Sequence, residues 1–162
     1  MKKSIFAVAA MGSAMLSAAP VTAAEYTTIL LEKAVNATPD RTWSRIGPYC
    51  AIATWLKVTC VVTSGNQVSV GTNRLLNGNN NEIMVAATPY SYTYTQPSST
   101  ILYHGTLAVE PTDRGQHSKI VYTLFYDQAP LNTPEAKAEN RATRTKRFTE
   151  ALEAMKQMAE AP

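Results

Sequence analysis

The stretch that decides the fold is the C-terminal run Thr133–Ala159, TPEAKAENRATRTKRFTEALEAMKQMA. Thr133 suits a helix N-cap, Pro134 suits the first helical position, and Glu135 places a negative charge where the helix dipole favours one. The pattern therefore predicts one long helix. A helix turns by about 100° per residue, so seven side chains lie along one stripe of its surface: Lys137, Arg141, Arg144, Phe148, Leu152, Met155 and Ala159.

This stripe is basic in its N-terminal half and apolar in its C-terminal half. We expect the apolar half, centred on Phe148 and Leu152, to anchor the helix in the core. We expect Arg141 and Arg144 to mark the rim of a cavity, because an isolated buried arginine is unfavourable unless it is paired or reaches water. Two interpretations remain open: these cations bind a carboxylate or phosphate of a ligand, or their stems cover apolar surface while their heads stay in solvent.

The chain before this helix has the pattern of strands joined by short turns. Tyr26–Val35 is the first predicted strand, Thr38-Pro39 opens a short helix that ends at Gly47-Pro48, and Tyr49–Thr54 forms a second. Six further strands are predicted: Leu56–Thr63, Gln67–Leu76, Glu82–Thr88, Tyr90–Thr95, Thr100–Val109 and Ser118–Tyr126. Short turns give an antiparallel sheet, and helices segregated to one face of it give an α+β domain.

The chain begins with the pattern of a bacterial signal peptide. Met1-Lys-Lys-Ser4 precedes the mostly apolar run Ile5–Ala19 and the small residues of Val21-Thr-Ala-Ala24. A basic start, a short apolar segment and small residues before a cut are typical of secretory signals. A retained anchor would need about 18 unbroken apolar residues, and the run is interrupted. We predict cleavage after Ala23 or Ala24 and a periplasmic or secreted protein.

The remaining 138 residues carry 13 basic and 12 acidic side chains, a net charge of +1. This length suits one domain with its own core, which we place at 25–162. A nearly neutral chain lacks the basic surface that a nucleic-acid partner requires. No second apolar segment is long enough to span a bilayer, so we expect no stable membrane insertion after cleavage.

Two cysteines, Cys50 and Cys60, fall within this domain. In an oxidising compartment such a pair is a reasonable disulfide, whose closure would contribute about 3 kcal/mol in the chain-entropy model. The alternative is two buried free thiols that behave as small hydrophobes. We favour the disulfide.

The element order resembles the helix-grip fold of the START/Bet v 1-like (SRPBCC) superfamily, in particular its bacterial polyketide cyclase/dehydrase branch. Four segments carry the resemblance: ATPDRTW at 37–43, YCAIATW at 49–55, GTNRL at 71–75 and YHGTLAVEP at 103–111. It implies an antiparallel sheet of about seven strands wrapped around the C-terminal helix, with two short helices between the first and second strands. It also implies an apolar cavity between sheet and helix, where members bind lipids, steroids, polyketides or plant hormones and some catalyse cyclisation or dehydration.

Signatures of metal and cofactor chemistry are missing from the sequence. It contains no GxSxG, P-loop, HExxH or CxxC pattern, and its two histidines, His104 and His117, are 13 positions apart. We therefore predict neither a metal nor a cofactor.

Six of the eight tyrosines lie in the last three predicted strands: Tyr90, Tyr92, Tyr94, Tyr103, Tyr122 and Tyr126. Because successive side chains of a strand point to opposite faces, the tyrosines within each of these strands share one face. If these faces point inward, phenols line a pocket for an amphipathic aromatic or sterol-like ligand. The alternative is a tyrosine-rich cross-strand ladder that packs the sheet.

His104 should face away from Tyr103 and toward solvent in a regular strand. A bulge would turn it inward and make it a general-base candidate, so Tyr103 and His104 are the weak catalytic candidates. Arg74 shares its parity with Val68 and Val70, which suggests that it points inward, either to a ligand or to a diagonal pair with Glu82. The predicted ligand-binding residues are Trp55, Arg74, Tyr92, Tyr94, Tyr103, Tyr122, Arg141, Arg144 and Phe148.

Three functions are compatible with these features. The first is an exported protein that binds a hydrophobic, aromatic or lipid-like small molecule, with or without an anionic group. The second is a metal-free cyclase or dehydratase that uses pocket tyrosines for proton transfer. The third is a structural protein with a collapsed core. The shortage of acid–base residues favours binding.

Overall fold

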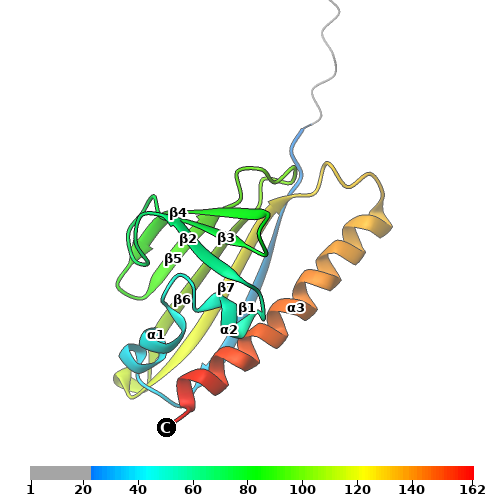
Figure 1. Ribbon diagram of the computed structural model, residues 1–162. Helices are drawn as coiled ribbons and strands as arrows, with labels where there is room; N and C mark the ends of the chain where they lie inside the picture. Colours follow the sequence, from blue (N-terminus) through cyan, green and yellow to red (C-terminus); the bar gives the residue numbers. More distant parts are fainter. Residues whose placement is uncertain (1–22) are drawn as a thin grey trace, which may run out of the picture.

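The computed structural model describes residues 23–162 (Figure 1). The predicted signal peptide over 1–24 lies almost wholly outside these residues. The strands are β1 (Tyr26–Val35), β2 (Cys60–Ser64), β3 (Asn73–Leu76), β4 (Asn80–Thr88), β5 (Ser91–Thr95), β6 (His104–Thr112) and β7 (His117–Asp127). The helices are α1 (Pro39–Ile46), α2 (Ile52–Trp55) and α3 (Pro134–Glu160), with a 3-10 turn, η1 (Asp113–Gly115), between β6 and β7.

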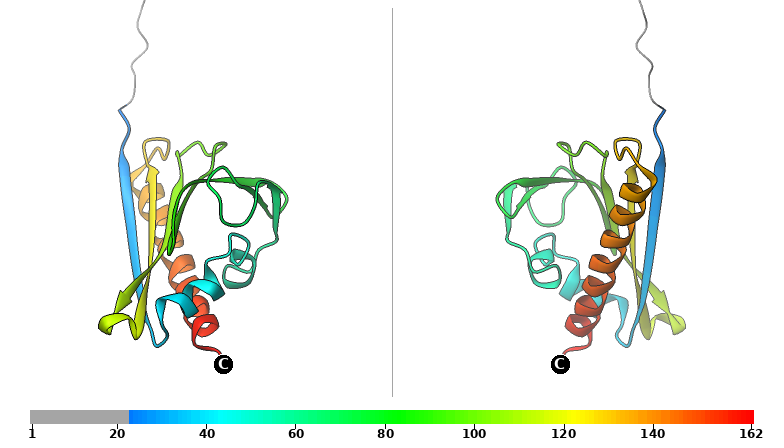
Figure 2. Two further views of the ribbon diagram at one scale, coloured as in Figure 1. Left: turned by 90° about the vertical axis from the view of Figure 1, so that its left-hand side faces the viewer. Right: turned by 90° about the vertical axis from the view of Figure 1, so that its right-hand side faces the viewer.

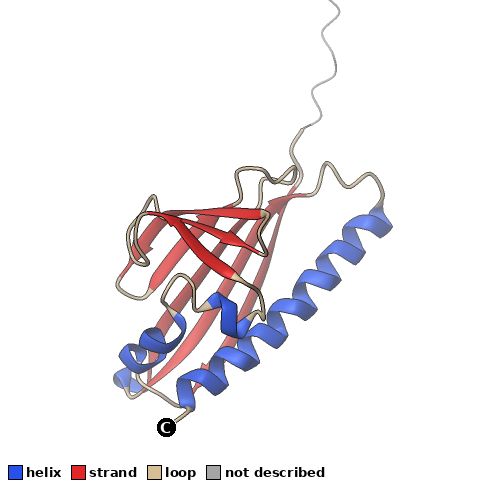
Figure 3. Ribbon diagram, viewed as in Figure 1, coloured by secondary structure: helices blue, strands red, loops and turns tan. Residues whose placement is uncertain are grey.

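The seven strands form one antiparallel sheet in the order β1-β7-β6-β5-β4-β3-β2. Strands β2 to β7 follow one another as a meander, and β1 adds to the far edge by pairing with β7, with Ile29 opposite Leu124. The sheet curves strongly, and the three α-helices lie on its concave side (Figures 2 and 3). The predicted α+β helix-grip fold is confirmed.

Helix α3 divides into two halves with different surroundings. Its buried residues all lie in the C-terminal half: Phe148, Ala151, Leu152, Met155 and Ala159. These side chains share the core with inward residues of the sheet such as Leu107, Ile120 and Leu124. The residues of α3 before Phe148 are exposed or half-buried. The predicted apolar anchor is therefore confirmed, and the N-terminal half of α3 is left to cover a cavity.

The two short helices are fixed to the rest of the domain at their ends. Thr38 caps α1 by accepting a hydrogen bond from the Arg41 amide, and the Arg41 Nε donates to the Ala159 carbonyl at 3.2 Å, which holds α1 against the end of α3. Cys50, just before α2, forms a disulfide with Cys60 at the start of β2. The predicted disulfide is confirmed.

The segment before β3 does not form the predicted strand over Gln67–Leu76, of which only Asn73–Leu76 pair as a strand. The Asn66 Oδ1 accepts hydrogen bonds from the Val68 amide at 3.0 Å and the Ser69 amide at 2.9 Å. Such an Asx turn satisfies backbone donors locally and competes with a strand ladder. Val68 and Val70 therefore lie exposed in a loop.

The first predicted strand of the meander also begins later than expected, at Cys60 rather than Leu56, because α2 and a turn occupy the residues before it. None of the helices within residues 23–162 is both long and apolar enough to cross a membrane.

Candidate functional site

A cavity of about 500 Å³ lies between the sheet and the N-terminal half of α3. One wall is apolar and comes from α2, the segment that follows it, β3 and α3: Ile52, Leu56, Val58, Leu76 and Phe148. Exposed residues of α3, among them Glu139 and Arg147, also border the cavity, so it reaches the surface along this helix. Its volume falls in the range of about 300–1,000 Å³ that is typical of small-molecule pockets.

The polar groups of the cavity come from β4, from β5 and from the segment between β5 and β6. Glu82, Tyr94, Gln96 and Tyr103 border it there, and Asn77 and Asn80 border it at the turn between β3 and β4. The cavity is therefore amphipathic, because both apolar side chains and hydrogen-bonding groups border it. This composition suits a ligand that is itself part apolar and part polar.

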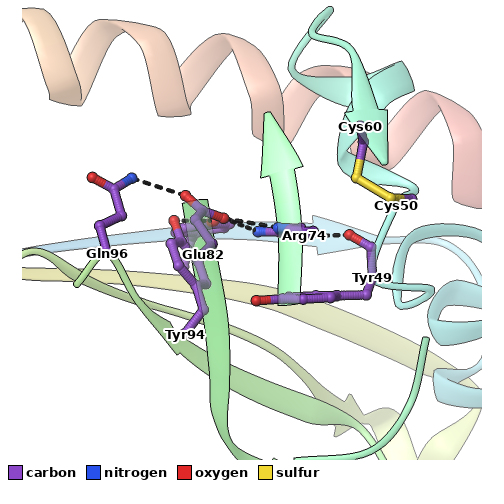
Figure 4. Close-up of polar contacts among 8 residues, drawn as sticks. Tyr49, Cys50, Cys60, Arg74, Glu82, Tyr94 and Gln96 are labelled. Carbon is purple, nitrogen blue, oxygen red and sulfur yellow. Dashed lines mark hydrogen bonds and ion pairs between the residues drawn. A yellow bond between two sulfur atoms is a disulfide. The ribbon is translucent and has the colours of Figure 1, made fainter. Parts of the chain in front are cut away.

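Glu82, one of these polar groups, belongs to a buried ion pair between neighbouring strands (Figure 4). Arg74 on β3 lies directly opposite Glu82 on β4. The Arg74 Nε and Nη2 donate to Glu82 Oε2 at 2.8 Å and 2.5 Å, and the Gln96 Nε2 donates to Glu82 Oε1 at 2.8 Å. Arg74 is fully buried and Glu82 is 2% exposed. The two charges neutralise each other where neither reaches solvent.

Aromatic rings surround the Arg74 guanidinium. Its Cζ lies 3.9 Å from the centroid of the Tyr49 ring and 5.0 Å from that of Tyr94, and the Arg74 Nη1 donates to the Tyr49 carbonyl. Cation–π contacts of this kind contribute more when desolvated. Arg74 itself does not border the cavity: its predicted inward direction is correct, and its partner is Glu82 directly across the strands rather than on the diagonal.

The inward tyrosines form both a cross-strand ladder and part of the cavity wall. Tyr94 and Tyr103 border the cavity, and the hydroxyls of Tyr94 and Tyr122 are hydrogen-bonded at 3.0 Å. Tyr92 and Tyr122 lie beyond the cavity wall. The inward tyrosines therefore pack against one another across the strands, and two of them also line the cavity; the binding of an aromatic or sterol-like ligand there stays a prediction.

Burial controls the protonation of these phenols. It raises the pKa of Tyr103 to about 12 and holds the pKa of Tyr94 and of Tyr122 well above the usual value. The cavity tyrosines are therefore neutral hydrogen-bonding groups near pH 7. A group is most effective in proton transfer when its pKa lies near the working pH. These phenols do not meet this condition, because their pKa values lie far above pH 7.

The two arginines that the sequence places together on α3 have different surroundings. Arg144 borders the cavity, where its Cζ lies 4.7 Å from the ring centroid of Tyr103 and 5.0 Å from that of Tyr126. Its Nε donates to Asn140 Oδ1 at 2.8 Å. Arg141 instead donates from Nη1 to the Thr27 hydroxyl and the Thr28 carbonyl of β1. The expectation that both arginines mark the cavity holds for Arg144 and is wrong for Arg141.

The guanidinium of Arg144 is held in place without being neutralised. Within residues 23–162 no carboxylate forms an ion pair with it, and its two terminal nitrogens have no hydrogen-bond partner there. Arg147, one turn further along α3, borders the same cavity. This part of the cavity therefore has a positive charge and free donors.

Other predicted site residues lie away from the cavity. His104 is on the outer face of β6, where its Nδ1 lies 2.7 Å from the Leu102 carbonyl, so the alternative that turns it inward is wrong. Trp55 is buried edge-on against Tyr122 and borders a separate groove between α2 and α3. Tyr92 borders a second, smaller cavity of about 340 Å³ beside Trp43 and Met84.

The sequence analysis paired Glu82 with Arg74 but did not place it at the cavity, and it did not single out Gln96, Asn140 or Arg147 as site residues. For Asn140 a signal was present, because it lies one turn before Arg144 on the same predicted helix. For Glu82 the signal was the opposite charge of Arg74 across the Asn-rich turn. In the described part of the chain no group of three or more His, Cys, Asp and Glu residues is placed to bind a metal.

Comparisons with known proteins agree with this architecture. A search of curated proteins finds no match. Solved structures do match, among them a protein from Nitrosospira multiformis at 23% identity, covering 80% of this chain and 96% of that one with a TM-score of 0.62. A protein from Thermobifida fusca matches at 20% identity, 82% and 92% coverage and a TM-score of 0.70. The Bet v 1-like protein Ara h 8.0201 matches at 14% identity, 85% and 100% coverage and a TM-score of 0.60.

These structural likenesses concern the fold alone, since each identity is below 25%. The family comparison goes further, because one family model matches residues 27–160, from the second residue of β1 to the last residue of α3. The chain therefore belongs to the family described as polyketide cyclase / dehydrase and lipid transport, within the SRPBCC superfamily.

Proposed function

We propose that this protein binds a small amphipathic molecule, apolar or aromatic in its body and anionic at one end, in the cavity between the sheet and α3. The observation that carries the proposal is the unpaired guanidinium of Arg144, which borders a cavity of about 500 Å³ that also has an apolar lining. A cation fixed by two aromatic rings and by Asn140 loses little freedom when an anion binds. A carboxylate or phosphate would receive charge-assisted hydrogen bonds from it.

Binding is favoured over the two other functions that the sequence leaves open. A cavity of this volume argues against a structural protein with a collapsed core. The neutral tyrosines, with Tyr103 at a pKa of about 12, argue against rapid proton transfer by phenols. His104, the other candidate base, lies on the outer face of the sheet.

The test uses 2-naphthoate as an aromatic anionic probe, titrated by calorimetry into the wild type, Arg144→Gln and Arg141→Gln. Both variants remove one positive charge from the same helix, so the second is a matched control for long-range electrostatics. A hydrogen-bonded charge contributes about 1.5–3 kcal/mol, so Arg144→Gln should weaken binding by roughly tenfold or more. Arg141→Gln should leave the affinity within about twofold. Equal loss in both variants, or no binding to the wild type, would contradict the proposal.

The natural ligand can be sought without a candidate. Native mass spectrometry of protein purified from its own host should show an added small molecule, and the bound compound should remain unchanged on incubation. Conversion of that compound to a product would support the cyclase or dehydratase alternative instead.

We also propose that the protein is exported and loses residues 1–24. The basic and apolar pattern of the first residues and the Cys50–Cys60 disulfide, which suits an oxidising compartment, support this location. Intact-mass measurement of the protein from the periplasmic fraction should give a chain that begins at Ala24 or Glu25. A full-length chain in the cytoplasm would contradict export.

A further inference from the structure

We infer that Glu82 selects ligands that carry a hydroxyl group, by accepting a hydrogen bond inside the cavity. This inference rests on the proposed function and concerns the other end of the same ligand. A hydroxyl near Glu82 and an anionic group at Arg144 would together fix how the molecule lies in the cavity.

The inference begins with the hydrogen-bonding capacity of the Glu82 carboxylate. An ionised carboxylate offers about four acceptor positions, two on each oxygen. Oε2 accepts from the Arg74 Nε and Nη2, and Oε1 accepts from the Gln96 Nε2. Among residues 23–162, three donors therefore fill three positions, and one position on Oε1 is left.

The remaining acceptor position belongs to a side chain that borders the cavity. Glu82 is 2% exposed, so its carboxylate can be reached only from the cavity that it borders. A buried acceptor without a donor is unfavourable, and hydrogen bonds that involve a charged group are stronger than neutral ones. A ligand donor that reaches Oε1 is therefore favoured over an apolar group at the same place.

The surroundings of Glu82 indicate a neutral donor rather than a cation. The Arg74 guanidinium already balances the carboxylate charge, and Arg144 and Arg147 border the same cavity. A ligand ammonium group would approach three positive charges, and of the two carboxylates that border the cavity Glu82 is already paired and Glu139 is exposed to solvent. A hydroxyl supplies the hydrogen bond without that repulsion.

The first test needs no variant, because it compares ligands on the wild-type protein. The probes are 2-naphthoate, its 5-, 6- and 7-hydroxy derivatives and the corresponding methoxy compounds, titrated by calorimetry. At least one hydroxy compound should bind roughly tenfold tighter than 2-naphthoate, and its methoxy counterpart should lose that gain because it cannot donate. If no hydroxy compound is preferred while 2-naphthoate still binds in an Arg144-dependent way, the inference is overturned and the proposed function stands. If 2-naphthoate does not bind in that way, both are overturned.

The second test assigns the preference to Glu82. Glu82→Gln should reduce the hydroxyl preference to about twofold or less, while Glu139→Gln, which changes an exposed carboxylate bordering the same cavity, should keep it. Should Glu82→Gln not fold because Arg74 loses its partner, the paired variant Arg74→Met/Glu82→Leu removes both charges together and serves the same purpose. A hydroxyl preference that survives loss of the carboxylate would overturn the inference.

Discussion

Arg74 and Glu82 face each other across strands β3 and β4 and form an ion pair that is almost fully removed from solvent. Desolvation of two charges is unfavourable, and it is offset here by three hydrogen bonds from Arg74, two to Glu82 and one to the Tyr49 carbonyl. Glu82 borders the main cavity, and Met84, two residues further along β4, borders the smaller one together with Tyr92.

Removing one partner of this pair should destabilise the protein strongly. Arg74→Met leaves a buried carboxylate without its counter-charge, and the free energy of unfolding should fall by about 3–5 kcal/mol. Arg74→Met/Glu82→Leu removes both charges and should lie within about 2 kcal/mol of the wild type. Urea unfolding of the wild type, the two single variants and the double variant measures the coupling. If the stability losses of the two single variants add up to the loss of the double variant, Arg74 and Glu82 do not interact directly.

Gly105 on β6 should be essential for the position of Tyr94. A Cβ at Gly105 would lie 2.4 Å from the Tyr94 Cζ and hydroxyl, so even alanine overlaps the ring. Gly105→Ala should lower the free energy of unfolding by about 1–3 kcal/mol, as overpacked cores do, and should alter the cavity that Tyr94 borders.

The Tyr94→Leu background tests the cause of this loss. Leucine is shorter than tyrosine, so Gly105→Ala should be less destabilising in that background than in the wild type. Urea unfolding gives the comparison. An equal loss in both backgrounds would point to backbone strain rather than to the Tyr94 ring.

The sequence was sufficient for the fold because its signals are local and repeated. The N-cap and proline at 133–134, the apolar positions from Phe148 to Ala159 and the turns between strands each point to the same α+β architecture. Agreement among helix caps, apolar periodicity and turn residues is what specifies a single structure. The prediction of a strand was wrong where local hydrogen bonds compete with strand pairing, as at Asn66 before β3.

The site was harder to predict, because its residues depend on which strand face points inward. A shift of one residue moves a whole strand's side chains to the other face. Glu82 was predicted as a partner of Arg74, but its place at the cavity depends on which face of β4 points inward, and the sequence did not show that. Arg141 and Arg144 share a stripe on the helical wheel, but hydroxyl and carbonyl oxygens of β1 bind Arg141, and no periodicity reveals that.

The buried phenols should make the protein sensitive to alkali. Because burial raises the pKa of Tyr92, Tyr94, Tyr103 and Tyr122 in the folded state, the unfolded chain loses these protons first as the pH rises. Their contribution to stability is fully present below about pH 10 and is lost above it. For Tyr103, a pKa of about 12 against the ordinary 10 corresponds to about 3 kcal/mol.

Circular dichroism and phenolate absorbance measured together should show this behaviour. The ionisation of the four buried phenols should coincide with the loss of the circular-dichroism signal between about pH 10 and 12, since these phenols ionise only on unfolding. Tyr103→Phe should move that transition to higher pH. Ionisation of all tyrosines near pH 10 with the fold intact would contradict their burial.

Loss of the Cys50–Cys60 disulfide should lower stability without changing the fold. The two cysteines are 10 residues apart, and closing such a loop restricts the unfolded chain by about 3 kcal/mol in the chain-entropy model. Cys50→Ala/Cys60→Ala should therefore show a free energy of unfolding lower by about that amount in urea. The wild type in dithiothreitol should show a similar loss, and the double variant should not respond to the reductant.

Because the bridge joins the start of α2 to β2, and Ile52 and Leu56 of this segment border the cavity, the affinity for 2-naphthoate should fall as well. If the oxidised wild type is no more stable than the double variant, the bridge does not stabilise the protein or hold this wall of the cavity in place.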